Sequence, residues 1–185
     1  MEHIVVPLDA MHARAVADLA GRLATAVGCA PAAAPAHPHV TLASYRGVPP
    51  ATAVAALAPV AAALAPFTVR AHGYGMFTGD RPEDLSLHVM VVRTTALDDL
   101  HGRVHRALSR AGAETVGLTD PRVWTPHITL IERQLTPDRL GRAVELLAVR
   151  EHRSWSIRVA ALAAGPRMGR RPAPMVLRGR PVSGP

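Results

Sequence analysis

The sequence has few residues of several kinds that often reveal a protein's class. Its 185 residues include one cysteine, so no disulfide can form within the chain and no cysteine-based zinc site can be built. Only 3% of the residues are aromatic, and much of the apolar half of the composition is alanine and valine. No apolar run reaches the roughly 20 residues needed to cross a bilayer. These shortages exclude a disulfide scaffold and leave one ordinary globular domain with enough apolar residues to bury a core.

The N-terminal segment also lacks a targeting pattern. Residues 1–7 contain no basic stretch followed by an apolar one, so we expect no signal peptide. We therefore expect a soluble cytoplasmic protein without membrane association, and the sequence indicates no obligate protein partner. Cys29 follows a predicted helix and is expected to be a small buried residue rather than a nucleophile.

The charge balance favours an anionic partner. Lysine and arginine together number 21 against 14 acidic residues, which gives a formal net charge of +7 with histidine neutral. Arginine supplies this basic charge, and its guanidinium suits bidentate contacts with phosphate. The balance is consistent with phosphate or nucleic acid as a ligand.

Hydrophobic periodicity predicts strands and helices in alternation. Strands are expected at residues 3–8, 40–45, 67–72, 85–93, 124–131, 155–162 and 175–182. Helices are expected at residues 11–27, 49–64, 95–111 and 137–149. Asp9 is the expected N-cap of the first helix, and Pro59 is expected to end or kink the second. The glycine-rich residues 73–83 are predicted to form a loop or hairpin.

The pattern His-Φ-Thr-Φ, where Φ is an aliphatic residue, occurs at residues 39–42 and again 88 positions later at residues 127–130. The same offset aligns residues 67–70 with residues 155–158, so a strand–helix–strand block is repeated. This repeat is too long for a solenoid. We predict an α+β fold: one bilobal domain of two pseudo-symmetric lobes (about residues 1–83 and 84–185), with antiparallel sheets facing a central cleft and helices outside.

The two motifs carry residues suited to acid–base chemistry on a phosphate. Alternate residues of a strand share a face, so each histidine and threonine point together while the aliphatic residues point into the core. Two imidazoles can serve as general acid and general base near neutral pH. Two hydroxyls can donate hydrogen bonds to phosphate oxygens. This chemistry requires neither a metal nor another cofactor.

With these motifs, the chain resembles the 2H phosphoesterase superfamily and, within it, the 2′-5′ RNA ligase / RNA 2′,3′-cyclic phosphodiesterase branch. Residues 3–9, the first motif and residues 122–127 fall where that family has counterparts. The resemblance implies a metal-independent hydrolase that opens 2′,3′-cyclic phosphates or acts on 2′-5′ phosphodiester links. It implies His39 and His127 as the acid–base pair, with Thr41 and Thr129 holding the phosphate. The implied substrate is RNA with a 2′,3′-cyclic phosphate end or a small cyclic nucleotide.

The roles within this pair and the ligase subtype stay open in the sequence. We hypothesise that His127 activates water and His39 protonates the leaving ribose oxygen; the roles reverse for the reverse reaction. Many ligase-like members place an arginine soon after the second motif. Here the nearest is Arg133, preceded by Glu132, so its register differs from that pattern.

Three aromatic residues are further candidates for substrate contact. Strand alternation predicts that Tyr45 points to the same face as Thr41, where it would stack on a base or pack at the strand end. Trp124, three positions before His127, is a candidate for stacking or for core packing. Phe77, in the glycine-rich segment, is a candidate wall of the groove.

Basic residues and other histidines allow alternative interpretations. Arg122 and the cluster Arg167, Arg170 and Arg171 either hold flanking phosphates or form a solvated basic surface. An alternative site uses His37, His39 and His127 as metal ligands, but Pro38 and the lack of a nearby carboxylate disfavour it. A third possibility is a non-catalytic RNA-binding module. The remaining histidines, among them His88, His101 and His105, are interpreted as surface or structural residues.

Overall fold

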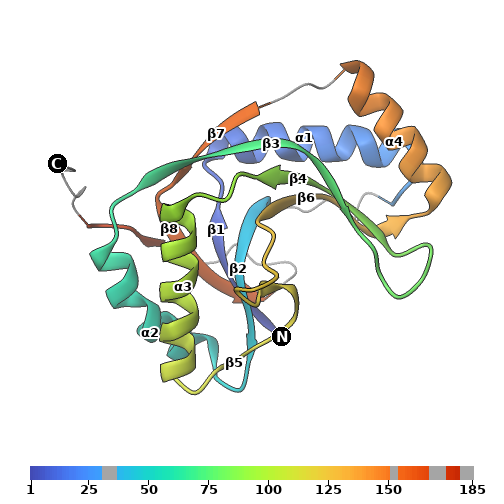
Figure 1. Ribbon diagram of the computed structural model, residues 1–185. Coiled ribbons are helices and arrows are strands. Elements are labelled where there is room, and N and C mark those ends of the chain that lie inside the picture. The colour runs from blue at the N-terminus through green and yellow to red at the C-terminus, as the bar shows by residue number, and fades with distance from the viewer. Residues whose placement is uncertain (31–36, 151–153, 167–173, 180–185) are drawn as a thin grey trace.

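The computed structural model describes residues 1–30, 37–150, 154–166 and 174–179 (Figure 1). The strands are β1 (Glu2–Pro7), β2 (His39–Arg46), β3 (Phe67–Phe77), β4 (Leu85–Val91), β5 (Glu114–Thr115), β6 (His127–Leu135), β7 (Ser154–Val159), β8 (Ala161–Pro166) and β9 (Pro174–Val176). The helices are α1 (Ala10–Ala26), α2 (Pro50–Ala63), α3 (Thr95–Arg110), α4 (Pro137–Arg150) and the 3-10 turn η2 (Gly117–Thr119). Within these residues no helix is long and apolar enough to span a membrane.

The strands pair antiparallel in one sheet of nine, in the order β7-β3-β4-β6-β2-β1-β8-β9, with β5 beside β2. The α+β class and the antiparallel pairing are therefore confirmed. The strands were expected in two facing sheets, but β2 and β6 join them into one, at the single residue pair Val40–Ile128.

The four helices form two groups on either side of the centre of the sheet. Helices α2 and α3 pack together, α3 against β2 and α2 against β8, whereas α1 packs against β6 and α4 (Figure 1). Each group therefore combines a helix from the first half of the sequence with one from the second. Strands from the two halves of the sequence are likewise neighbours in the sheet. Strand β3 from the first half lies beside β4 and β7 from the second, and β1 from the first half lies beside β8 from the second.

Positions related by the offset of 88 residues meet each other in the sheet. Val40 pairs with Ile128 at the centre, and Val69 pairs with Ile157 between β3 and β7. Both pairs are what a duplicated unit with an approximate twofold axis would produce, because residues on such an axis would meet their own equivalents.

The core consists of the apolar faces predicted by periodicity. Helix α3 buries Leu97, Leu100, Val104 and Leu108 on one face. It begins at Thr94, whose side chain accepts a hydrogen bond from the Leu97 backbone N–H. Asp9 likewise caps α1, as predicted, by accepting from the His12 N–H.

Several predicted boundaries differ from the structure, whereas helix α2 ends within one residue of its predicted end. It continues through Pro59, which lies on its exposed side, to Ala63. Strand β3 continues to Phe77 because Gly73 takes a left-handed conformation (φ 77°) where the register with β4 shifts. The strand predicted at residues 155–162 is two strands, since β7 pairs with β3 and β8 with β1.

Candidate active site

The register of β2 and β6 places both motifs on one patch of the sheet. Val40 lies opposite Ile128, and both side chains are buried. In an antiparallel pair this register sets His39 level with Thr129 and Thr41 level with His127. All four residues point away from the core and are half-buried, which is the accessibility that a reacting group requires.

Both imidazoles are held by the backbone in the same way. The His39 Nδ1 lies 2.7 Å from the carbonyl oxygen of His37, and the His127 Nδ1 lies 2.7 Å from that of Thr125. A carbonyl can only accept, so in each neutral ring the proton sits on Nδ1 and Nε2 is the basic nitrogen. The two accepting carbonyls are 88 positions apart in the sequence, as are the two histidines that they orient.

His127 is held toward its neutral form. Burial lowers its pKa, and the positive charge that His39 can carry lowers it further. The Thr125 carbonyl and the Glu132 carboxylate oppose these effects. A neutral imidazole with a basic Nε2 is the form that a general base requires.

Two rings from the strands β3 and β4 form a cluster with His127 and support it. Phe77 stacks on His88 with ring centroids 4.3 Å apart and meets His127 edge-on at 4.7 Å. The centroids of His88 and His127 are 4.9 Å apart. Burial lowers the pKa of His88 to about 4, so this ring is uncharged at neutral pH. The cluster is packed tightly, since a Cβ on Gly75 would lie 2.5 Å from the His88 Nε2.

A β-bulge in each motif strand reverses the side-chain alternation. The register of β2 with β1 skips Leu42, and that of β6 with β4 skips Leu130. The prediction that Tyr45 faces the cleft is therefore wrong. Its side chain is fully buried, because the extra residue turns the following side chains to the opposite faces.

Trp124 is a structural residue and not an exposed stacking platform. Its side chain is buried, its indole stacks on the His101 ring with centroids 3.8 Å apart, and its Nε1 donates to the Thr41 carbonyl oxygen at 3.0 Å. The adjacent Leu42 carbonyl accepts a hydrogen bond from the His105 Nε2 at 3.1 Å. The side chains of Trp124 and His105 thus supply hydrogen-bond donors to two carbonyls of β2, which pairs with β6 at only one described residue pair.

Phe77 and the arginine candidates lie in different environments. Phe77, predicted as a wall of the groove, contacts His127 and therefore lies beside the second motif. Arg122 is exposed and pairs bidentately with Asp120. Arg133 is exposed and has a left-handed backbone (φ 51°), with its N–H bound to the Ser86 hydroxyl. The arginine cluster predicted at residues 167–171 lies outside the described residues.

His88, His101 and His105, interpreted from the sequence as surface or structural residues, are buried and structural, and their spacing already contained a signal of this. His88 alternates with Leu87 and Val89 and is therefore on the motif face of β4. His101 and His105 follow Leu97 at helical spacing, on the apolar face of α3. Histidine on an apolar face indicates a buried imidazole with a specific partner.

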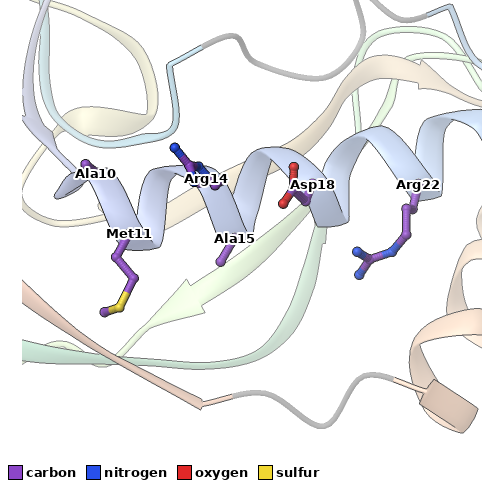
Figure 2. Close-up of a pocket in the computed structure, with 6 residues that line it drawn as sticks. All are labelled: Ala10, Met11, Arg14, Ala15, Asp18 and Arg22. Atoms are coloured by element: carbon purple, nitrogen blue, oxygen red, sulfur yellow. The ribbon is translucent and has the colours of Figure 1, made fainter.

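Two other features do not coincide with the motif patch. Figure 2 shows a hollow along the exposed side of α1, lined by Ala10, Met11, Arg14, Ala15, Asp18 and Arg22. None of these is a motif residue. In the described part of the chain, no three histidine, cysteine or acidic residues gather at metal-binding distances.

Comparison with known proteins agrees with this geometry. The family model of the 2′-5′ RNA ligase superfamily matches residues 7–164. No curated protein matches the sequence significantly.

Several solved structures share the fold. TT0787 of Thermus thermophilus has 18% identity and a TM-score of 0.61, covering 96% of this chain and 98% of its own. A protein described as a phosphoesterase has 20% identity and a TM-score of 0.56, covering 94% of this chain and 93% of its own. Escherichia coli LigT, solved with 3′-AMP, has 17% identity and a TM-score of 0.54, covering 94% and 92%. The family match spans both motifs, and the chain therefore belongs to the 2′-5′ RNA ligase superfamily of 2H phosphoesterases.

Proposed function

We propose that this 2H phosphoesterase opens 2′,3′-cyclic phosphates at the ends of RNA or on small nucleotides, with two histidines as acid and base. The main support is the pair of motifs, whose His and Thr side chains lie on one patch around the Val40–Ile128 contact. Their residue types match the two proton transfers and the anion that this reaction requires.

In the proposed reaction, His127 is the base and His39 the acid. The His127 Nε2 removes a proton from water as the water oxygen bonds to phosphorus. The bond from phosphorus to one ribose oxygen breaks, and that oxygen takes a proton from the Nε2 of a protonated His39. Thr41 and Thr129 hydroxyls donate to the non-bridging oxygens, and the product is a phosphomonoester. The lowered pKa of His127 supports its role as the base.

The test is turnover of a 2′,3′-cyclic mononucleotide in excess EDTA. We expect activity in wild-type protein and a decrease in kcat of roughly a hundred- to ten-thousand-fold in His39→Ala and in His127→Ala, since each positioned acid or base contributes about this factor. Circular dichroism would establish that the variants fold.

His72→Ala is the matched control, because this histidine is exposed on β3 outside the motifs and should leave turnover unchanged. Wild-type turnover in either motif variant would disprove the mechanism. Nucleotide binding without turnover would indicate a non-catalytic RNA-binding protein, and loss of activity in EDTA would indicate a metal enzyme.

A further inference from the structure

The second pair of equivalent positions, Val69 and Ile157, is surrounded by polar residues that the reaction does not use. Thr68 lies opposite Arg158, and Arg70 lies opposite Ser156. All four side chains are exposed, whereas Val69 and Ile157 are buried beneath them. The approximate twofold relation that gathers two histidines and two threonines at one place therefore gathers two arginines and two hydroxyl residues here.

These arginines lie on the same face of the sheet as the catalytic candidates. His127 is opposite Met90, and Val91, the next residue of β4, is opposite Ala71 of β3 with its side chain in the core. Arg70 therefore points to the face of Met90 and His127. Strand β3 lies two strands from β6, which is roughly 10 Å across the sheet at the usual strand spacing.

Among the residues that the structure describes, no ion pair balances the charge of this patch. Within the described residues neither Arg70 nor Arg158 forms an ion pair, in contrast to Arg46 and Arg103, which pair with Glu114 and Asp99. Strands β3, β4 and β7 contain no aspartate or glutamate. Two arginines on neighbouring strands repel each other unless an anion lies between them. Guanidinium groups flanked by hydroxyls bind phosphate oxygens well.

We propose that Arg70 and Arg158, with Thr68 and Ser156, bind a backbone phosphate of a single-stranded RNA whose cyclic end occupies the histidine site. The inference rests on the proposed function and narrows its substrate to a polynucleotide end rather than a mononucleotide. A mononucleotide has no second phosphate to reach this patch.

The experiment compares two substrates and two double variants. The substrates are a 2′,3′-cyclic mononucleotide and an oligoribonucleotide ending in a 2′,3′-cyclic phosphate. The variant Arg70→Ala/Arg158→Ala should raise KM for the oligonucleotide about tenfold or more and leave the mononucleotide KM within about twofold. Because the contact with one backbone phosphate is lost, the slope of log affinity against log salt concentration should become shallower by about 0.7.

Arg46→Ala/Arg103→Ala is the matched control, since it removes the same charge from exposed ion pairs elsewhere. An equal effect in this control, or an unchanged oligonucleotide KM in the test variant, would overturn the proposal. Anisotropy of a labelled oligoribonucleotide with a 3′-phosphate end measures the same contact without turnover. If the wild-type protein binds the oligoribonucleotide through Arg70 and Arg158 but opens no cyclic phosphate, the proposed reaction is refuted and the RNA contact stands. If the wild-type protein opens the cyclic phosphate but the double variant binds the oligoribonucleotide as tightly as wild type does, only the RNA contact is refuted.

Discussion

At the level of single residues, the arrangement of the candidate site depends on groups outside the four motif side chains. The carbonyls of His37 and Thr125 fix which nitrogen of each motif histidine is basic. His88 and Phe77 then hold the His127 ring from the side. The space for this cluster exists because residue 75 has no side chain.

Gly75→Ala should therefore reduce activity although the residue is not catalytic. The new Cβ would lie 2.5 Å from the His88 Nε2 and 2.7 Å from the Met90 Sδ. Met90 can move, but the His88 ring is stacked and can shift only toward Phe77 or His127. We expect kcat to fall tenfold or more in a folded protein, as measured by steady-state turnover and thermal unfolding.

Gly141→Ala provides the comparison for this substitution. No atom lies within 4 Å of the Cβ position at Gly141, and the residue is in helix α4. This variant should keep full activity and gain roughly 0.5–1 kcal/mol of stability from the helix propensity of alanine. Equal activity of the two variants would show that the ring cluster does not control His127.

At the level of elements, strand β2 pairs with β1 along most of its length, but its placement beside the second motif depends largely on contacts outside the strand pairing. Strand β2 meets β6 at one residue pair, and beyond it the Thr41 and Leu42 carbonyls are bound by Trp124 and His105. The Ser44 N–H donates to the Thr119 hydroxyl in the same region. Helix α3 and the loop before β6 therefore set the position of β2 relative to the second motif.

Trp124→Phe should separate this role from simple packing. Phenylalanine can still stack on His101 but cannot donate to the Thr41 carbonyl, and an unsatisfied buried carbonyl costs about 1–3 kcal/mol. We expect kcat to fall several-fold with little change in KM, because the threonine and histidine of the first motif lose their fixed spacing from His127.

Trp155→Phe is the control, since Trp155 is also buried but lies in β7, away from the motifs. It should lower the melting temperature without changing kcat. If both variants lose activity only in proportion to their unfolded fraction, Trp124 has no positioning role.

At the scale of the whole molecule, buried histidines make stability depend on pH. Burial lowers the pKa of both His88 and His101 to about 4, whereas an unfolded histidine has a pKa near 6.5. Between these values the unfolded chain binds more protons than the folded one, so the stability from neutral burial is complete above pH 6.5 and is lost as the pH falls toward 4.

Urea unfolding at pH 7, 5.5 and 4.5 would measure this loss. Each histidine contributes on the order of 3 kcal/mol over the whole interval, since one pKa unit corresponds to about 1.4 kcal/mol. His101→Phe should retain an aromatic ring beside Trp124 and reduce the pH dependence by the share that His101 contributes, while the other buried histidines keep theirs. A free energy of unfolding that is constant from pH 7 to 4.5 would contradict these burial effects.

Features that depend on local periodicity and on the repeat could be predicted from the amino-acid sequence. Strand alternation is a local property, so it placed each motif histidine on the same face as its threonine and the aliphatic residues in the core. Helical periodicity likewise predicted the four helices. The offset of 88 residues predicted two equivalent motif strands facing one cleft, and their meeting at Val40 and Ile128 is found in the structure.

The surroundings of the motifs, in contrast, could be found only in the folded chain. A β-bulge arises from pairing with a neighbouring strand, so alternation within β2 could not reveal that Tyr45 turns into the core. The hydrogen bond from Trp124 to Thr41 joins residues 83 positions apart, and that from His105 to Leu42 joins residues 63 apart. Such contacts depend on how α3 packs against β2, which no local pattern contains.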